Sequence, residues 1–373
     1  VSTPLTHRAR TKMVFMNSTA SSMVQEGALS EAGFRIDSGF HKNYLVKPKI
    51  QSEGKIYHGL NRHMTMDDVI QFASDLYLIP LDQEIPGFTD FIGSWLYKGD
   101  RTLLVDIGPA ATVPNLVQAL EDLGVHTVDA VLLTHIHIDH AGGIGDFISH
   151  FPGTPVVCHA TGIPHLKDPT RVWEGSLKTL GDMARAYGPI RGVPEDLLQD
   201  AAQFREFGVS PILTPGHAPH HVSYRVEDFL FAGEAGGVYM ALPDDGVHLR
   251  PATPPRFYLK TSVQSLKSLL DIPHKLLCYA HFGATQRSPE MLEAHMHQLF
   301  RWAELIEAQI QRDSGPHVVE HCMEALLKKD PLLAGWPHMK GAVRDRERYF
   351  FHNSIKGFIG YLSDKAEKNK GKS

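Results

Sequence analysis

Three histidines and one aspartate stand within six residues of the segment LLTHIHIDHAGG, residues 132–143. Residues i and i+2 of an extended segment project to the same side, so His135 and His137 can bind one cation together. Asp139 and His140 follow where the chain turns, which lets them reach a second cation nearby. Imidazole nitrogens and carboxylate oxygens are ligands that zinc, manganese and iron accept. The segment therefore predicts part of a metal site, although it cannot complete two coordination spheres.

Further ligands are expected later in the chain, where apolar segments meet glycine-rich turns. His217 ends ILTPGH, Glu234 ends FLFAGE and His281 ends LLCYAH. Glycine leaves backbone room around a buried ion. Histidine is also abundant, with 23 in 373 residues, and it is the commonest protein metal ligand. Asp228 is the alternative to Glu234, but it stands at the start of its apolar segment.

The segment THIHIDHAGG, residues 134–143, meets the signature T-H-x-H-x-D-H-x-G-G in full, and with it the chain resembles the metallo-β-lactamase fold hydrolases. The segments LLVDIGP, TPGHAPHH and AHFG match the same family in order, over about residues 76–285. The resemblance implies an α/β fold, the αββα sandwich of this family. It also suggests an inserted helical cap over residues 161–206.

The resemblance implies a binuclear metal site, which divides the ligands into two groups and one bridging acid. The two groups and the acid are His135, His137 and His217; Asp139, His140 and His281; and Glu234. The family usually has Asp in the bridging place, so the extra methylene of Glu234 could lengthen the metal spacing or weaken the second site. Two divalent ions are expected, zinc first, with iron or manganese as alternatives.

The chemistry of such a site is hydrolysis. A water that bridges two ions becomes hydroxide near neutral pH and can attack a carbonyl or phosphoryl centre. Asp139 is the expected catalytic residue, because beside the hydroxide it can orient it and pass a proton to the leaving group. Asp106 in LLVDIG either accepts a hydrogen bond from a ligand imidazole or forms a turn before Gly108.

Other residues are candidates for contacts with the ligands or the substrate. They are His165, Arg171, Trp173, Tyr187, His220, His221 and Tyr239. The first four belong to the expected cap and would lie near the entrance, unless the cap is a solvated helix pair. His220 and His221 are expected to support a ligand or begin a strand, not to bind metal. Tyr239 could polarise a substrate carbonyl or pack in the core.

Apolar strands and amphipathic helices must position these residues. Strands are predicted over residues 76–81, 91–100, 101–109, 130–135, 155–160, 210–217, 220–226, 228–237 and 275–283. Helices are predicted over residues 64–72, 113–124, 173–188, 194–202 and 265–272. This order indicates an α/β fold, in which ligands gather at strand ends.

The chain is expected to have three regions. Residues 1–70 form an N-terminal extension, residues 71–285 the catalytic domain, and residues 286–373 a C-terminal helical region. The last region begins with an apolar stripe, Leu292, Met296, Leu299, Ala303, Ile306 and Ile310, which predicts a buried helix face or, less simply, a dimer seam. Its basic end, KAEKNKGKS, is predicted to be disordered.

Composition restricts the partners. A net charge of −5 gives no global field for nucleic acid, and no apolar run has the length of a membrane span. The three cysteines, Cys158, Cys278 and Cys322, are far apart and odd in number, which fits reduced thiols in the cytoplasm. A cytoplasmic enzyme with a small-molecule substrate is expected, as a monomer or homodimer, with no nucleic-acid or membrane partner.

The leading hypothesis is a binuclear metal-dependent hydrolase that uses a metal-bridging hydroxide to cleave an ester, thioester or lactone. A phosphodiesterase of the same fold is one alternative, because the same metal pair serves phosphoryl attack. A mononuclear iron dioxygenase similar to the persulfide dioxygenases is another, if Glu234 leaves one site unformed. A non-catalytic binding protein is the third, and the intact ligand set argues against it.

Overall fold

The computed structural model describes residues 68–242, 246–255, 257–313 and 315–370, all within one compact unit that spans residues 46–373. The expected N-terminal extension lies outside the described residues up to residue 67. Within the described ranges no helix is both long enough and apolar enough to span a bilayer.

The larger of two facing sheets has seven strands, which lie side by side in the order of the sequence. They are β1 (Ile70–Ala73), β2 (Leu76–Pro80), β3 (Gly93–Lys98), β4 (Thr102–Val105), β5 (Ala130–Leu132), β6 (Val156–Cys158) and β7 (Leu198–Asp200). The pairs from β1 to β4 are antiparallel, and those from β4 to β7 are parallel. The parallel half therefore needs crossover segments, which carry the helices of one outer layer.

The smaller sheet has five strands in the order β14-β13-β10-β9-β8. They are β8 (Val209–Leu213), β9 (Val222–Val226), β10 (Phe229–Gly233), β13 (Leu276–Tyr279) and β14 (Ala284–Thr285). Only β10 and β13 are parallel, so their carboxyl ends meet at one edge. A separate hairpin pairs β11 (Val238–Ala241) with β12 (Val247–Arg250).

Buried aromatic side chains join the two sheets. The ring of Trp95 on β3 lies 6.0 Å from that of Phe231 on β10, and its indole N–H donates to the Tyr279 carbonyl at 2.8 Å. The Tyr224 hydroxyl donates to the Leu133 carbonyl at 2.9 Å. Because the indole N–H and the tyrosine hydroxyl each have a hydrogen-bond acceptor, these large aromatic side chains can fill the space between the sheets without leaving those two donors unpaired.

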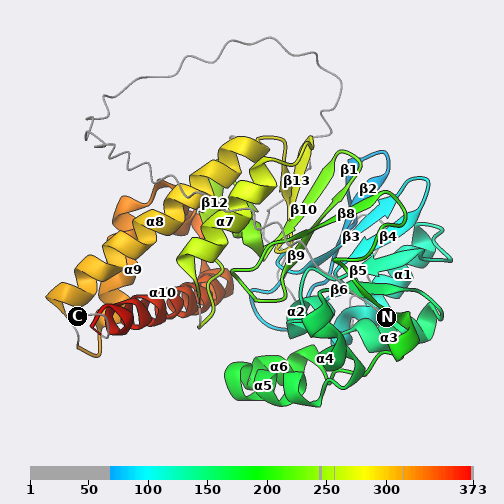
Figure 1. Cartoon of the computed structure of the whole chain (residues 1–373), viewed down its shortest axis with the longest axis horizontal. Coiled ribbons are helices and arrows are strands. Elements are labelled where there is room, and N and C mark those ends of the chain that lie inside the picture. Colours follow the sequence, from blue (N-terminus) through cyan, green and yellow to red (C-terminus); the bar gives the residue numbers. More distant parts are fainter. Residues whose placement is uncertain (1–67, 243–245, 256, 314, 371–373) are drawn as a thin grey trace, which may run out of the picture. The chain divides into compact units, whose positions relative to one another are not determined.

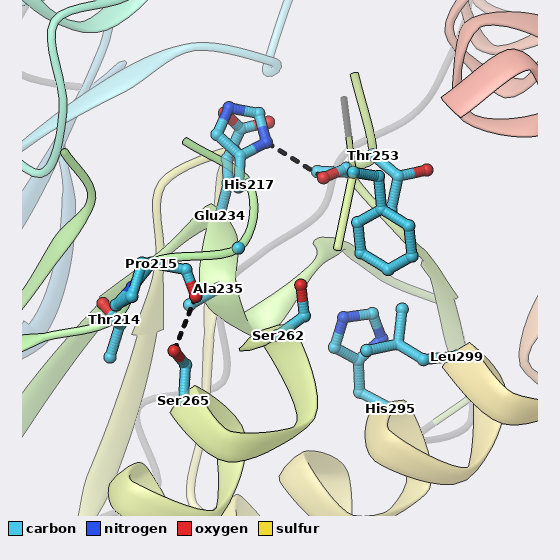
Figure 2. A pocket seen from close by; sticks show the side chains of 13 residues that line it. Thr214, Pro215, His217, Glu234, Ala235, Thr253, Ser262, Ser265, His295 and Leu299 are labelled. Carbon is cyan, nitrogen blue, oxygen red and sulfur yellow. Dashed lines mark hydrogen bonds and ion pairs between the residues drawn. The ribbon is translucent and has the colours of Figure 1, made fainter. Parts of the chain in front are cut away.

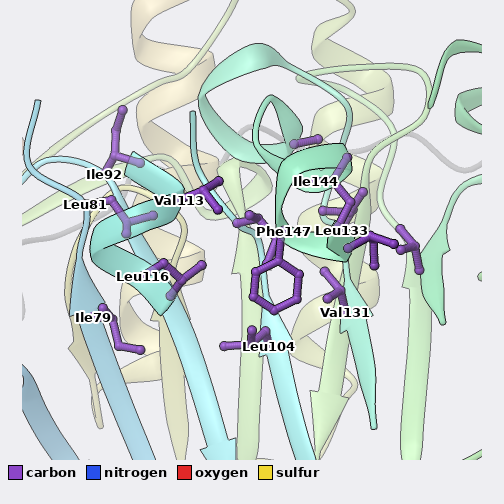
Figure 3. Close-up of a cluster of buried hydrophobic side chains, with 14 of the residues drawn as sticks. Ile79, Leu81, Ile92, Leu104, Val113, Leu116, Val131, Leu133, Ile144 and Phe147 are labelled. Carbon is purple, nitrogen blue, oxygen red and sulfur yellow. The ribbon is translucent and has the colours of Figure 1, made fainter. Parts of the chain in front are cut away.

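Helices on the outer face of the larger sheet bury one apolar cluster. They are α1 (Val113–Asp122) and α3 (Ile144–His150), with the single-turn α2 (Ile138–Ala141) between them in sequence. Figure 3 shows Leu116 and Phe147 pointing from the helices toward Leu104 and Val131 on the strands. All four side chains are fully buried, so α1 and α3 fix the end of β5.

The smaller sheet is covered by four helices, α7 (Leu259–Leu270), α8 (Ser288–Arg312), α9 (Val318–Lys329) and α10 (Gly341–Lys370) (Figure 1). The stripe on α8 is buried at Leu292, Leu299 and Ile306, in a cluster that also contains side chains of α7, α9 and α10. Contacts within the chain therefore account for the stripe. With the two sheets between two helical layers, the predicted αββα sandwich and the helical C-terminal region are confirmed.

Short helices complete the chain. The inserted segment forms α4 (Ile163–Lys167), α5 (Thr170–Leu180) and α6 (Asp182–Tyr187), and the last two pack on α2. The single-turn 3-10 helices are η2 (Ala110–Thr112), η3 (Ala160–Gly162), η4 (Glu195–Leu197), η5 (Glu234–Gly236), η6 (Pro331–Leu333) and η7 (Trp336–His338).

Each of the nine predicted strands overlaps an observed one, but two predicted helices are wrong where the structure describes them. In the first, predicted over residues 64–72, Ile70–Ala73 forms β1, which pairs with β2. In the second, predicted over residues 194–202, only the turn η4 is helical and Leu198–Asp200 forms β7 beside β6. In both places backbone pairing with an existing sheet edge outweighs a weak helical pattern.

The predicted disordered tail is also wrong for residues 365–370, which continue α10. The residues KAEKNK are mostly good helix formers, and helix propagation onto an existing helix costs little. The ammonium group of Lys365 lies 3.7 Å from the Glu307 carboxylate on α8, which favours the continued helix. Residues 371–373 lie outside the described part of the chain.

One buried carboxylate joins the hairpin to α10. Oε2 of Glu347 lies 2.6 Å from Nε of Arg250 on β12, and Oε1 lies 3.1 Å from Nη2 of Arg346. Burial raises the pKa of Glu347, but the two guanidinium groups outweigh it and lower this pKa to about 2. The ionised carboxylate is therefore favoured in the folded protein relative to the unfolded one.

We expect Glu347→Gln to lower the free energy of unfolding by about 3–5 kcal/mol at neutral pH, because it leaves buried arginines without their anion. Wild-type stability from this group is present above the ordinary carboxyl pKa and falls as pH drops toward 2. The variant should lose this part of the acid dependence in urea unfolding measured between pH 3 and pH 7. Glu324→Gln, at an exposed position of α9, should follow wild type. A variant that unfolds as wild type does would show that the buried group is not needed.

Candidate metal centre

Seven predicted ligands gather at strand ends of the two sheets. His135 and His137 follow β5, Asp139 and His140 lie in α2, His217 follows β8, Glu234 follows β10 directly, and His281 follows β13. In the described part of the chain they form two groups. Within each group the ligand atoms lie within 4.8 Å of one another. The groups are His135, His137, His217 and Glu234, and Asp139, His140 and His281. This division agrees with the two groups expected from the sequence.

The carboxylate of Glu234 contacts both groups. Its Oε2 lies 2.7 Å from Nε2 of His217 and 3.1 Å from Nε2 of His135, while Oε1 lies 3.1 Å from Nε2 of His281. Nε2 of His140 is 3.6 Å from Oε2. Glu234 is 7% exposed, and the surrounding imidazoles outweigh the effect of burial and hold its pKa well below the usual range. One ionised carboxylate therefore stands between two sets of histidines.

Two ligand histidines donate their Nδ1 proton to a backbone carbonyl. Nδ1 of His217 lies 2.9 Å from the Ala252 carbonyl oxygen, and Nδ1 of His281 lies 3.3 Å from that of Phe91. A carbonyl can only accept, so Nδ1 carries the proton and the neutral ring has its lone pair on Nε2. Both rings therefore present Nε2 to the cluster, which is the orientation a metal ligand needs.

Asp106 and Thr134 orient two more histidines. Oδ2 of Asp106 lies 3.0 Å from Nδ1 of His140 and accepts the Thr134 hydroxyl at 2.7 Å, and Oδ1 accepts the Thr134 backbone N–H at 2.7 Å. Since that hydroxyl donates to Asp106, it accepts from Nδ1 of His135, 3.0 Å away. Asp106 thus contacts a ligand imidazole, as one of its two expected roles requires, and Nε2 of both rings points inward.

The donor set fits divalent cations. Nε2 of His135 and of His140 is buried and has no hydrogen-bond partner among the described residues. Buried polar atoms without a partner are uncommon in folded proteins, and a bound ion is one explanation for them. Burial and His217 lower the pKa of His137 to about 3, so its ring stays neutral, and its Nδ1 faces Nε2 of His217 at 3.0 Å. Facing ring nitrogens and orphaned lone pairs around carboxylates are the chemistry of a metal site.

Among the residues expected near the substrate, those of the cap differ in position. Arg171 is exposed, His165 is half-buried on α4, and the half-buried Trp173 packs against the cluster below α1 and α3. The Tyr187 ring is buried and lies 6.4 Å from that of Phe88. None of these four belongs to the two ligand groups.

The remaining candidates divide between the centre and the core. The His220 ring lies 6.0 Å from that of His137, and its buried Nε2 has no hydrogen-bond partner among the described residues. The Tyr239 ring stacks on Tyr279 at 4.5 Å in the core, the second of its two expected roles. Asp228, the alternative to Glu234, pairs with Lys275 at 2.6 Å on the surface.

The sequence predicted one shared role for His220 and His221, but the structure gives His221 a structural role of its own. Its Nε2 accepts the backbone N–H of Glu234 at 3.1 Å, and Nδ1 lies 2.8 Å from the Thr214 hydroxyl. A Cβ atom at Gly233 would collide with this imidazole, and Gly233 has φ +60°. The glycine before Glu234 is therefore required. In the sequence, the available signals for this contact were the pair Gly233-Glu234 and the adjacent His220 and His221. Phe91 and Ala252 offered none, because any residue supplies a carbonyl, whereas Thr134 acts through its hydroxyl and stands in the THIHIDHAGG signature.

Among the described residues, the centre is more exposed at Asp139 than at His217 and Glu234. Behind His217 and Glu234 lies a cavity of about 10 Å³, which has room for about one water molecule (Figure 2). His295 and Ser262 line this cavity from the helices α8 and α7. On the other side the Asp139 side chain is 20% exposed and His137 is half-buried, whereas the side chains of His135 and His140 are at most 1% exposed. A substrate would therefore approach Asp139 and His137.

Comparison with known proteins identifies the family of this chain. A family model described as the metallo-beta-lactamase superfamily matches residues 89–281. A metallo-beta-lactamase fold-containing protein of Sulfurisphaera tokodaii is 31% identical over 240 residues, 61% of this chain and 85% of that protein. The hydroxyacylglutathione hydrolase of Yersinia enterocolitica is 30% identical over 199 residues, and the match spans 53% of this chain and 64% of that enzyme.

A solved structure agrees in fold. The crystal structure of an archaeal metallo-beta-lactamase superfamily protein from Sulfolobus tokodaii superimposes with a TM-score of 0.57 at 23% sequence identity. The superposition covers 77% of this chain and 99% of that one. Together with the family model and the relatives, it shows that the chain belongs to the metallo-β-lactamase superfamily.

Proposed function

We propose that this metal-dependent hydrolase binds two divalent ions, zinc in the first place, and cleaves a thioester, ester or lactone. The observation that carries the proposal is the position of Glu234, whose two carboxylate oxygens contact histidines of different ligand groups. Such a carboxylate suits a bridge between two ions. The longer side chain in place of the family's usual Asp therefore still supports two sites.

The residues divide the work of hydrolysis. Two bound divalent ions would lower the pKa of a water molecule and stabilise negative charge that develops on the substrate. Asp139 is the proposed catalytic residue: its Oδ2 lies 3.5 Å from Nε2 of His140 and 3.8 Å from Nε2 of His281, on the more exposed side of the centre. From there the carboxylate can take a proton from the attacking water and deliver it to the leaving group.

A thioester is the substrate class that the relatives favour. Hydroxyacylglutathione hydrolases are about as similar in sequence as the other relatives, at 30% identity in the Yersinia enzyme. Their name describes an acyl group on a thiol, and the match spans under two thirds of their length. Lactones and esters share the same carbonyl attack, so they belong in the same substrate test.

A small-molecule substrate in the cytoplasm remains our proposal for context. Cys158, Cys278 and Cys322 are buried and unpaired, which supports a reducing compartment. The apolar stripe of α8 is used within the chain, so a homodimer would need another surface.

Metal content tests the binuclear site. We expect about two zinc, manganese or iron ions per chain in elemental analysis of protein purified without chelator or a histidine tag. The Glu234→Ala variant should retain fewer than one ion per chain, because the substitution removes the carboxylate that contacts both ligand groups. Asp228→Asn, which alters an acid exposed at the surface, should retain two. A single iron in wild type, with oxygen consumption, would favour the mononuclear dioxygenase instead.

Loss of the Asp139 carboxylate tests the proton transfer. Asp139→Asn should lower kcat toward the best thioester or lactone by about 100-fold or more, with a smaller change in KM. The variant must first be shown to retain its metal, since Asp139 also belongs to the second ligand group. Asp146→Asn is the control. Asp146 lies in the next helix, α3, and pairs with the exposed Arg191. Equal kcat in Asp139→Asn and wild type would remove Asp139 from the mechanism.

Thr134 is expected to tune metal binding without touching the metal. Thr134→Val keeps the side-chain volume but removes the hydroxyl between Asp106 and His135. Loss of such an outer partner typically costs about 10- to 100-fold in metal affinity. Competition with a chromophoric zinc chelator measures this, and Thr134→Ser should restore affinity. No change in Thr134→Val would mean that the His135 ring is held by packing alone.

A further inference from the structure

The C-terminal helix α10 lies outside the residues that match the family model, yet it holds both backbone carbonyls that orient ligand histidines. These carbonyls belong to Phe91, which accepts from His281, and Ala252, which accepts from His217. The two histidines are in different ligand groups. The segments around Phe91 and Ala252 each have their own set of contacts with α10.

Arg346 of α10 holds the segment of Phe91. Its guanidinium carbon lies 3.9 Å from the centre of the Phe91 ring, and Nη1 donates to the Gly87 carbonyl at 2.5 Å. The His281 ring also packs on Phe91, with the ring centres 4.5 Å apart and 26° between the planes. The cation–π contact and the hydrogen bond to Gly87 therefore hold a phenylalanine that contacts His281 with both its ring and its carbonyl.

Close backbone contact supports this first arm. Gly87 has φ +87°, and a Cβ atom there would collide with the carbonyl of Ala342 in the first turn of α10. The helix start is thus packed against the loop that leads to Phe91. Arg346 is 5% exposed and shares the Glu347 carboxylate with Arg250, so its own position is fixed.

Ser354 and Glu347 of α10 hold the segment of Ala252. The Ser354 hydroxyl donates to the Pro251 carbonyl at 2.8 Å, and the Thr253 hydroxyl donates to the Ser354 carbonyl at 2.9 Å. Arg250, which directly precedes Pro251, binds Glu347. A Cβ atom at Gly357 would collide with the Thr253 carbonyl, so helix and segment are in direct contact. Ala252 lies between these anchors in sequence, and its carbonyl accepts from His217.

We propose that α10 is a positioning element of the metal centre, in which Arg346 fixes His281 through Phe91, and Ser354 with Glu347 fixes His217 through Ala252. The inference rests on the proposed metal centre and adds that residues far outside the ligand-bearing domain set its affinity. Because the two arms reach different ligand groups, each arm governs one site more than the other. None of these α10 side chains is a ligand or a catalytic residue.

Cobalt(II) binding to the metal-free full chain tests the two arms separately. Cobalt is titrated in and followed by its visible absorption, with a competing chelator to resolve two affinities. We expect Arg346→Met to weaken one of the two sites by about 10- to 100-fold and the other much less. Ser354→Ala should weaken the other site by about threefold or more, since the hydrogen bond to the Pro251 carbonyl is lost.

Two substitutions on the same helix serve as matched controls. Arg348→Met removes an exposed guanidinium that contacts Glu320, and Ser363→Ala removes a hydroxyl that bonds only the Ile359 carbonyl of its own helix. Both should bind cobalt as wild type does. Thermal unfolding of each metal-free variant is measured beside the titration, so that lost stability is separated from lost affinity in protein that is still folded.

The outcomes separate the two proposals. Wild-type affinities in both Arg346→Met and Ser354→Ala, with two cobalt ions in wild type, would overturn the positioning role and leave the binuclear centre standing. Fewer than two cobalt ions in wild type would overturn the binuclear centre and the inference with it. Should Arg346→Met not fold, Arg346→Lys retains the charge and a donor without the planar group. Weakened cobalt binding in Arg346→Lys supports the proposal, and unchanged binding contradicts it.

Discussion

The centre of this protein depends on one buried carboxylate among imidazoles. Glu234 lies at the end of β10 and reaches histidines from three other segments of the chain, at 2.7–3.1 Å. An ionised acid at this depth is stable only because cationic or metal-binding groups surround it. The surrounding chain must therefore bring several strand ends to one point and hold each ring at a fixed rotation.

The sandwich meets this requirement through its parallel pairs. β5 in the larger sheet and β10 with β13 in the smaller sheet deliver His135, Glu234 and His281 from their carboxyl ends. The aromatic layer around Trp95 and Phe231 fixes the distance between the sheets. Apolar packing thus provides the rigidity, and the polar residues of the centre follow the carboxyl ends of these strands.

Outer contacts then fix which nitrogen each ring presents. Asp106, Thr134 and two backbone carbonyls bind Nδ1 of four histidines, and so leave Nε2 for the cluster. The two carbonyls lie in segments that contact α10. In our proposal the C-terminal helix therefore serves the metal centre as well as the fold.

The sequence by itself identified the seven residues that the structure brings together, because metal ligation restricts residue type and spacing so strongly that HxHxDH and the later strand-end residues stand out. It also predicted nine strands, because apolar runs bounded by glycine leave few alternatives, while the αββα class followed from the resemblance to the metallo-β-lactamase fold hydrolases. The tertiary structure alone decided the two edge strands that the sequence assigned to helices, since their backbone partners are distant in the chain. It alone decided the roles of Phe91, Ala252 and Arg346 as well. A carbonyl or a stacked ring has no signature in sequence, and its function exists only where the fold places it.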